Sequence, residues 1–409
     1  MSRKNQRGIM VLLTLYRATS YDIIFFYPIQ LIFLYQTRGI SLAQNVFLES
    51  CFWLFNFVFM TVATIISEKI TTKQATVAGS ILWIISVLIY LQPASSYYYY
   101  LLLLAEVIRA LGLSLKSVAD FALIRDVLEQ RGLYDNSLSG QKNYSSVEGN
   151  AMAINCTGDA IVAFLSAKLM AISPNLAMWL CLASCIYGLV LSCMLPSQPR
   201  HNKPISTEDM KSTTYRSIMS NKVIATVVIH VFIVYGTFCY WENLGKNLLQ
   251  EIQVTAWTYG IIMTLLYVSN SLGGIIAGKR VLQSFFASRK KFIAFITFFN
   301  LGCMLILGIL GLSTAKIAII MITVILIIQS MIKTSYITDM KLSLQKQANR
   351  GINKKISNLL FSSEHLGKAI TMAIASGIVE VSSTAKCYIA LTAILLIPCI
   401  LISKKVQLD

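Results

Sequence analysis

Four ionisable side chains lie inside one otherwise apolar stretch of the chain. The segment LLLLAEVIRALGLSLKSVADFALIRD, residues 101–126, reads as a membrane helix but contains Glu106, Arg109, Lys116 and Asp120. At 100° per residue all four fall within an arc of about 80° on the helix. A charge at the centre of a bilayer costs roughly 2.5–3.5 kcal/mol on insertion scales. We therefore expect this face to look toward other protein groups or a polar cavity rather than lipid.

The spacing of these residues suggests what they do. Glu106 and Arg109 are three residues apart and can pair across one helical turn, as can Lys116 and Asp120, which are four apart. An arginine near mid-membrane can bind an anionic substrate group, and a carboxylate beside it can exchange a proton when its positive partner moves. We predict this role for Arg109 and Glu106. The alternative is a static row of ion pairs that holds helices together. For Lys116 and Asp120 we expect a structural or gating role.

Two further acidic residues are candidates for binding a proton or a substrate. Asp22 lies in the first apolar run and Glu364 in the eleventh. Arg17 lies about 140° around a helix from Asp22, so these two should not pair, and Asp22 is expected to face a cavity. Glu364 and Lys368 share one helix face. His365 lies about 100° away and is expected to be a packed or solvated histidine.

Enzyme chemistry has no support in the sequence. We find no G-x-x-x-x-G-K-[ST] loop for ATP and no hydrolase or kinase pattern, so we predict a non-enzyme without catalytic residues. The nine cysteines lie in or beside apolar runs, without a C-x-x-C pair or a histidine cluster. They are expected to be small buried hydrophobes, and we predict no metal and no cofactor.

The elements that position these residues are apolar runs of membrane-spanning length. Of the 409 residues, 56% are hydrophobic and 13% charged, whereas soluble domains have about a quarter charged. A bilayer core needs about 20 apolar residues per helix. Twelve runs satisfy this, at approximately 9–34, 44–66, 75–92, 97–124, 146–172, 174–195, 223–250, 256–278, 290–312, 315–340, 354–380 and 385–403. The prediction is an all-α integral membrane protein with twelve transmembrane helices.

The distribution of basic residues supports this count. Most of the 35 Lys and Arg fall in segments on one side of the predicted membrane, whereas the outer loops and their edges hold Arg38, Lys316 and Lys386. Since cytoplasmic loops carry an excess of Lys and Arg, both termini are predicted to be cytoplasmic. The net charge of +17 is spread over every inner loop. We therefore expect contact with a lipid bilayer and no nucleic-acid partner.

The chain divides into two halves at its longest polar interval, residues 196–222. TIISEK (64–69) ends the second span and GIIAGK (274–279) ends the eighth; IRD (124–126) ends the fourth and ITD (337–339) the tenth. These matches recur at an offset of about 210 residues and indicate two six-helix halves with related folds. We predict an N-terminal half over 1–195, a cytoplasmic central loop over 196–222 and a C-terminal half over 223–409.

Several motifs resemble those of the major facilitator superfamily. RGISLAQNVFLESCFWLFNF is similar to the G-L-S-x-x-Q start of that family's second helix. TIISEKITTK resembles its loop G-x-x-x-D-[RK]-x-G-[RK]-[RK], with Glu68, Lys69 and Lys73 as acid and bases and both glycines replaced. SVADFALIRDVL resembles a run of one bacterial branch with many presumed exporters, and contains Asp120 and Asp126. The resemblance implies gating roles for these five residues.

Two other segments extend the resemblance over the length of the chain. EVIRALG is similar to the helix-four motif of proton-coupled drug antiporters, with Arg109 and Gly112 in the places of its Arg and Gly. NRGINKKISNL is similar to the R-A-T-x-x-S segment before helix eleven and places Arg350 in a gating position. The G-P-x-x-G-G antiporter motif of helix five is absent.

The resemblance implies a proton-coupled secondary transporter of two pseudo-symmetric six-helix halves in the cell (plasma) membrane of a bacterium, working by alternating access. We expect efflux, by antiport, of a hydrophobic or amphipathic small molecule or a small peptide. Two alternatives remain open. One is uptake of a nutrient by symport in the same fold, and the other is a membrane receptor or scaffold that transports nothing.

Overall fold

The chain folds into α-helices. The computed structural model describes residues 3–20, 23, 26–133, 138–196, 220–238, 243–278, 286, 288–313, 315–347 and 353–405. These residues contain helices and no strand. The predicted all-α fold is therefore confirmed.

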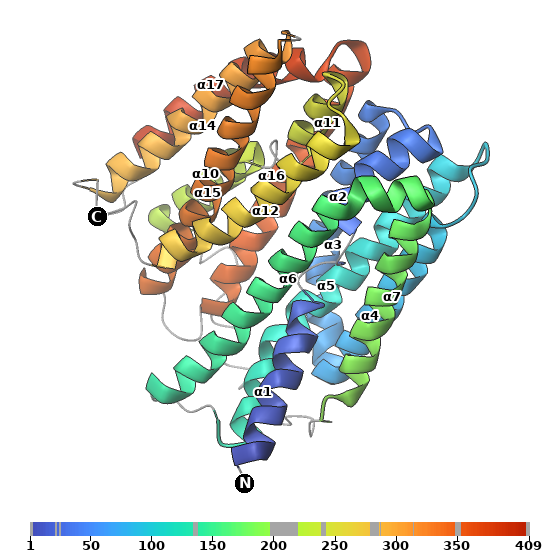
Figure 1. Ribbon diagram of the computed structural model, residues 1–409. Helices are drawn as coiled ribbons and strands as arrows, with labels where there is room; N and C mark the ends of the chain where they lie inside the picture. The colour runs from blue at the N-terminus through green and yellow to red at the C-terminus, as the bar shows by residue number, and fades with distance from the viewer. Residues whose placement is uncertain are drawn as a thin grey trace. The chain divides into compact units, whose positions relative to one another are not determined.

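The helices are described in chain order (Figure 1). In the N-terminal part they are α1 (Arg3–Ala18), α2 (Phe26–Ile32), the π-helical η1 (Phe33–Thr37), α3 (Leu42–Lys69), α4 (Thr72–Tyr90), α5 (Tyr98–Gln130), α6 (Leu138–Ile172) and α7 (Leu176–Met194). In the C-terminal part they are α10 (Lys222–Phe238), α11 (Leu244–Glu251), α12 (Ala256–Gly278), α14 (Arg289–Gly311), α15 (Lys316–Gln347), α16 (Asn353–Val381) and α17 (Thr384–Lys405).

Each predicted span corresponds to one described helix, except for the first and the seventh. The first span comprises α1, α2 and the start of η1, and the seventh comprises α10 and α11. Within the described ranges, six helices are long and apolar enough to cross a membrane by length and composition: α3, α4, α7, α14, α15 and α17. Divided helices at corresponding positions of two halves are a feature of transporters, whose substrate sites lie at such breaks.

Packing separates the chain into two compact units. The first comprises Met1–Ile40 and Val58–His201, and the second comprises Ser41–Phe57 and Asn202–Asp409. The N-terminal part of α3 thus packs with the second unit, although it precedes most of the first in sequence. Two hydrogen bonds to α16 fix it there, from Ser50 Oγ to the carbonyl of Ala369 (2.8 Å) and from Ser376 Oγ to the carbonyl of Ala43 (2.9 Å).

The same helix pairs recur in both units. In the first unit α1 packs on α6, and α4 packs on α5 and α7. In the second unit α10 packs on α16, and α14 packs on α15 and α17. These three pairings join helices at corresponding positions along the two parts of the chain. The second unit also has a close pairing of α12 with α15.

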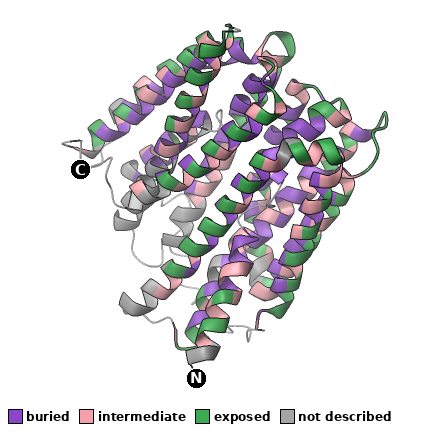
Figure 2. Ribbon diagram, viewed as in Figure 1, coloured by how far each residue is buried: buried purple, intermediate pink, exposed green. Residues whose placement is uncertain are grey.

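Burial in this protein is arranged for a lipid environment. Large apolar side chains are exposed along the helices, among them Ile161, Trp179, Ile309 and Ile317 at 54–68%. Four charged side chains of α5, by contrast, are buried: Glu106, Arg109, Lys116 and Asp120. Figure 2 shows exposed and buried residues alternating around individual helices. Extended apolar exposure is costly in water but favourable against lipid tails, and buried polar groups must then find partners inside the protein.

Two glycines let α4 and α5 touch at their backbones. A Cβ on Gly79 would lie 2.7 Å from the carbonyl oxygen of Gly112, and a Cβ on Gly112 would lie 2.7 Å from Cδ1 of Trp83. Small residues at a helix crossing permit this close approach in membranes. The contact brings α4 side chains against the charged face of α5.

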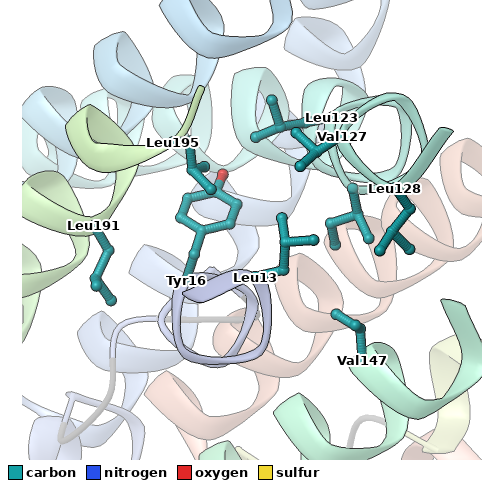
Figure 3. Packing of buried hydrophobic residues seen from close by; sticks show 9 residues of the cluster. Leu13, Tyr16, Leu123, Val127, Leu128, Val147, Leu191 and Leu195 are labelled. Atoms are coloured by element: carbon teal, nitrogen blue, oxygen red, sulfur yellow. The ribbon is translucent and has the colours of Figure 1, made fainter. Parts of the chain in front are cut away.

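An apolar cluster holds the end of α1 against α5, α6 and α7. Its buried members are Leu13, Tyr16, Leu123, Ile124, Val127, Leu128, Val147, Leu191 and Leu195. Figure 3 shows Tyr16 and Leu13 of α1 pointing into the space between these helices. This packing places the polar end of Tyr16, and its neighbour Arg17, beside α5.

Candidate functional site

The four ionisable residues of α5 are all buried inside the first unit. Glu106 and Asp120 are 0% exposed, and Arg109 and Lys116 are 1% exposed. Their polar partners come from α1, α4 and α5 itself, and residues of α2 and α6 bond in turn to those partners. These contacts form two groups, one around Glu106 and one around Asp120.

The Glu106 group consists of Glu106, Arg109, Tyr90, Gln30 and Phe26. The predicted pair is present, with Arg109 NH2 2.7 Å and Nε 2.8 Å from Glu106 Oε2. The Tyr90 hydroxyl donates to the other oxygen, Oε1, and Gln30 Nε2 donates to that hydroxyl at 3.4 Å. The Arg109 guanidinium lies 4.6 Å from the ring centroid of Phe26, which packs edge-on against Tyr90. The group thus combines a carboxylate, a guanidinium, an amide and two aromatic rings.

This group lies where the first span resumes after its break. Phe26 is the first residue of α2, and Gln30 follows one helical turn later. Their side chains therefore reach the charged face of α5 from the second half of a divided helix. A divided helix at a buried charge is the arrangement in which transporters hold small ligands.

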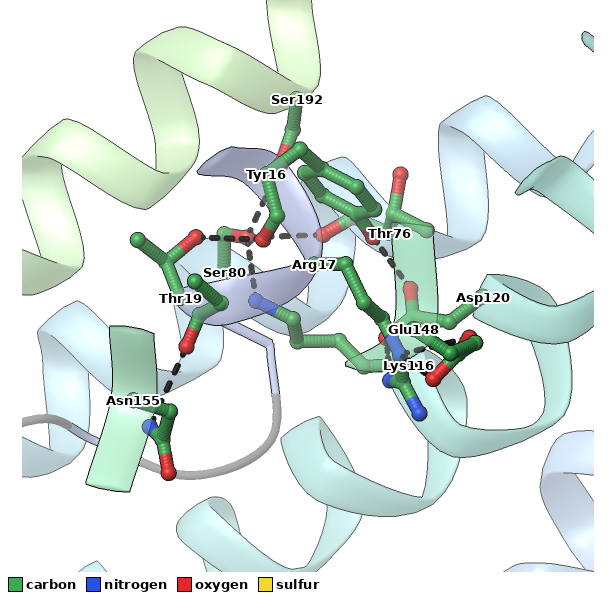
Figure 4. A network of polar contacts seen from close by, with 11 residues as sticks. Tyr16, Arg17, Thr19, Thr76, Ser80, Lys116, Asp120, Glu148, Asn155 and Ser192 are labelled. Carbon is green, nitrogen blue, oxygen red and sulfur yellow. Dashed lines mark hydrogen bonds and ion pairs between the residues drawn. The ribbon is translucent and has the colours of Figure 1, made fainter. Parts of the chain in front are cut away.

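The Asp120 group consists of Tyr16, Arg17, Lys116, Asp120 and Glu148 (Figure 4). Arg17 NH1 lies 3.0 Å from Asp120 Oδ2, and Arg17 Nε lies 3.1 Å from each carboxylate oxygen of Glu148. The Tyr16 hydroxyl donates to Asp120 Oδ1. One guanidinium on α1 therefore joins a carboxylate of α5 to a carboxylate of α6.

The predicted pair between Lys116 and Asp120 is wrong. Lys116 Nζ donates to Ser80 Oγ at 3.2 Å and lies 4.2 Å from the ring centroid of Trp83. The stem of Lys116 runs across Gly79, where a Cβ would lie 2.6 Å from Lys116 Cγ. The close crossing of α4 and α5 thus directs the ammonium toward α4, and Arg17 takes its place at Asp120.

Arg17, Tyr16 and Glu148 were not identified as partners of α5 from the sequence. Arg17 was considered only with Asp22, which lies outside the described residues. The contacts of Arg17 join residues 103 and 131 positions apart. Nothing in the local pattern of the sequence indicates such pairs. Their one signal was the presence of an embedded Arg in the first span and an embedded Glu near the start of the fifth.

In the second unit, the predicted pair on α16 is confirmed. Lys368 Nζ lies 3.1 Å from Glu364 Oε1, and both side chains are buried. Lys368 Nζ also lies 3.8 Å from the ring centroid of Trp53, on the part of α3 that packs in this unit. His365 stacks on the same indole at 5.0 Å between centroids, so it is packed as expected.

A neutral polar cluster in the second unit was missed in the sequence. His230 is 0% exposed, with Nδ1 2.7 Å from the hydroxyl of Tyr336 and Nε2 3.2 Å from that of Thr297. One turn away, Gln329 Nε2 donates to Asn300 Oδ1 at 2.9 Å. The cluster carries no charge when His230 is neutral, so charged residues within apolar runs do not reveal it.

The residues expected to gate have varied environments. Lys73 Nζ donates to the carbonyls of Cys193 (2.8 Å) and Leu195 (2.5 Å), and so caps the C-terminal end of α7 within the first unit. Lys69 is exposed and Asp126 is partly buried. The side chain of Glu68 and all of Arg350 lie outside the described residues. A gating role for these residues stays a prediction.

The described ranges contain no cluster of metal-binding side chains. Among their residues, no group of three or more His, Cys, Asp or Glu side chains could hold a metal ion. The polar groups above are instead suited to hydrogen bonding, charge pairing and proton exchange.

Comparison with solved structures identifies the fold. A mutant of the nucleoside transporter NupG superimposes with a TM-score of 0.77 at 10% identity, covering 98% of this chain and 100% of that chain. A POT family transporter in complex with a thioalcohol-conjugated peptide gives 0.69 at 12% identity, covering 97% and 94%. A bacterial homologue of the human lysosomal transporter Spinster gives 0.63 at 13%, covering 100% and 98%. At these identities the likeness shows the fold alone.

Sequence comparison identifies the family. A search of curated proteins finds no match. The model of the LacY proton/sugar symporter family matches residues 3–251, which is more than half of the chain. This match agrees with the transporter fold and with the resemblance of the motifs to the major facilitator superfamily. The chain therefore belongs to the LacY-type proton/sugar symporter family of the major facilitator superfamily, and is a secondary transporter rather than an enzyme.

Proposed function

We propose that the protein takes up a small hydroxyl-rich solute, such as a sugar, together with a proton. The observation that carries this proposal is the Glu106 group, in which an embedded ion pair meets an amide and aromatic rings at the break of the first span. Membership in a family of proton/sugar symporters supports the same solute class.

The chemistry of the Glu106 group suits a sugar. Each sugar hydroxyl can donate one hydrogen bond and accept others. Glu106 accepts, Arg109 donates, and the amide of Gln30 does both. The rings of Phe26 and Tyr90 offer apolar surface, as ligand pockets generally do around a few polar groups. The bond from Gln30 to Tyr90 is long at 3.4 Å, so a solute hydroxyl would replace it at little cost.

Uptake by symport is favoured over efflux. The expectation of antiport came from the likeness of EVIRALG to drug-antiporter motifs, whereas the family to which the chain belongs consists of symporters. The Glu106 group is also strongly polar, which suits a hydrophilic cargo better than a hydrophobic one. We further propose cytoplasmic termini in a bacterial cell membrane, and alternating access produced by the two six-helix halves over 1–195 and 223–409, joined by the loop 196–222.

Transport by purified protein in liposomes tests this proposal. A panel of labelled sugars, nucleosides and dipeptides is offered with a proton gradient of one pH unit, acidic outside. With one proton per solute, this gradient supports about tenfold accumulation of the true substrate. The addition of substrate without a gradient should carry protons inward. Accumulation of none of these solutes, or proton movement opposite to the solute, would refute uptake by symport.

Variants of the Glu106 group locate the site. We expect Glu106→Gln and Arg109→Lys to reduce solute exchange at least tenfold. The matched controls are Glu129→Gln and Arg125→Lys, because these residues form an exposed pair on the same helix, with 2.8 Å between Arg125 Nε and Glu129 Oε1. The controls should transport like the wild type. If the Glu106 and Arg109 variants do so as well, the solute binds elsewhere.

A further inference from the structure

One buried and one partly exposed carboxylate share one guanidinium in the first unit. Arg17 on α1 bonds to Asp120 on α5 and to Glu148 on α6. The side chain of Asp120 is 0% exposed, whereas that of Glu148 is 18% exposed. The contact between Arg17 and Asp120 therefore ties two helices together at a place closed to water.

The surroundings of Asp120 balance its charge. The charged or titratable side chains near it are Tyr16 and Arg17 of α1, Lys116 of α5, Glu148 of α6 and Cys185 of α7, and α4 adds the hydroxyls of Thr76 and Ser80. With both acids ionised and both bases charged, the group is formally neutral. Lys116 bonds to the neutral Ser80, so it is free of a fixed carboxylate partner and its charge acts on Asp120 through space.

We infer that Asp120 is the proton-binding residue of the transport cycle. This inference rests on the proposed proton-coupled uptake and separates the proton site from the solute site. A proton from the aqueous side adds to Asp120 Oδ2 and forms an O–H bond. The ion pair with Arg17 NH1 is then lost, while Arg17 stays bonded to Glu148. Release of the same proton to the other side restores the pair.

The geometry favours Asp120 over Glu106 and Glu148, the other two acids of the two polar groups described above. Glu148 is partly exposed, so its protons would exchange with water in any state and would not be coupled to the solute. Glu106 is buried, but its ionic partner Arg109 lies on the same helix. Neutralising Glu106 weakens an ion pair within one helix, whereas neutralising Asp120 removes the ion pair between α5 and α1.

Loss of the ion pair between Arg17 and Asp120 can affect the solute site through the chain that connects them. Arg17 is the penultimate residue of α1, directly before the break that ends at Phe26 of the Glu106 group. A change in the position of the end of α1 therefore acts on the start of α2. Asp120 and Glu106 also lie on the same helix, about 21 Å apart at 1.5 Å per residue. The proton and the solute thus bind at separate places connected by α5 and by the first span.

The variant Asp120→Asn separates exchange from accumulation. The amide keeps an oxygen for Tyr16 but cannot release a proton. We expect solute exchange within about twofold of the wild type, accumulation reduced from about tenfold to none, and loss of solute-driven proton uptake. Asp120→Glu, which restores an ionisable group, should recover part of the accumulation. Wild-type accumulation by Asp120→Asn would overturn the inference, as would loss of its exchange in protein that elutes as a folded species.

A spectroscopic measurement tests the proton site without any solute. Infrared difference spectra of the purified protein between acidic and alkaline pH should show a carboxylic acid C=O band that shifts in D₂O. We expect this band to be lost in Asp120→Asn and kept in Glu106→Gln, Glu148→Gln and the exposed control Glu129→Gln. A band that persists in Asp120→Asn overturns the inference. If the wild type accumulates no solute, the proposed function fails, whereas the band still decides the role of Asp120.

Discussion

The pair of Glu106 and Arg109 allows its structural and transport roles to be measured separately. The perturbation is the single variant Arg109→Met, compared with the double variant Glu106→Gln/Arg109→Met. The two charged atoms are 2.7 Å apart, and the side chains are 0% and 1% exposed. At an effective dielectric constant of about 20, their attraction is about 6 kcal/mol before the cost of desolvation is subtracted.

The two variants should differ in stability. Removal of one partner leaves a buried charge with the Tyr90 hydroxyl but without its counterion, which typically costs about 3–5 kcal/mol. Removal of both charges also removes both desolvation costs and is often close to neutral. We therefore expect Arg109→Met to be strongly destabilised and the double variant to recover most of the lost free energy of unfolding.

Thermal unfolding in detergent, followed by size-exclusion chromatography, measures this recovery. Exchange of the solute in liposomes then shows whether the recovered protein works, and we expect the double variant to be folded but inactive. A double variant that unfolds as readily as Arg109→Met would refute mutual compensation of the two charges. A double variant that transports like the wild type would show that the pair only holds the structure together. The corresponding variants of the exposed pair Arg125 and Glu129 should change stability by about 0–1 kcal/mol.

Three further predictions concern helix contacts. Gly112→Ala should lower the melting temperature, because overpacking of about 1–3 kcal/mol against α4 exceeds the gain of about 1 kcal/mol in helix propensity. The control Gly149→Ala has nothing within 4 Å of the new Cβ and should not lower the melting temperature. Equal melting temperatures of the two variants would contradict the close contact of α4 and α5 at Gly112. Lys73→Met removes the donor to the C-terminal carbonyls of α7 and should cost about 1–2 kcal/mol, measured by the same assay; unchanged melting would show that the cap contributes nothing. His230→Ala should cost about 2–4 kcal/mol through lost volume and the loss of its hydrogen bonds with Tyr336 and Thr297. His230→Gln should cost less, and the reverse order would disprove a hydrogen-bonding role.

Two kinds of sequence likeness lead to different directions of transport. One is the resemblance of separate motifs, and the other is the match to the family model. Short motifs such as EVIRALG predicted the superfamily but also suggested efflux. The family match over residues 3–251 draws on many positions at once, and it favours symport.

The sequence by itself determined the class of protein and the local charge pairs. Apolar runs of fixed length must become helices in a bilayer, because unpaired backbone groups are too costly there. Helical geometry then brings residues three or four apart together. The pairs Glu106–Arg109 and Glu364–Lys368 followed from that rule, and both are present.

Only the tertiary structure decided which distant groups meet. Lys116 and Asp120 are also four residues apart, yet Asp120 pairs with Arg17, because α1 packs on α6 beside α5. The close crossing at Gly79 turns Lys116 toward Ser80. Residues three or four apart pair where no side chain of another helix competes for the same partner. The sequence does not show which helix face will pack there. Packing therefore set the composition of the Asp120 group, while the sequence set the positions of its charges.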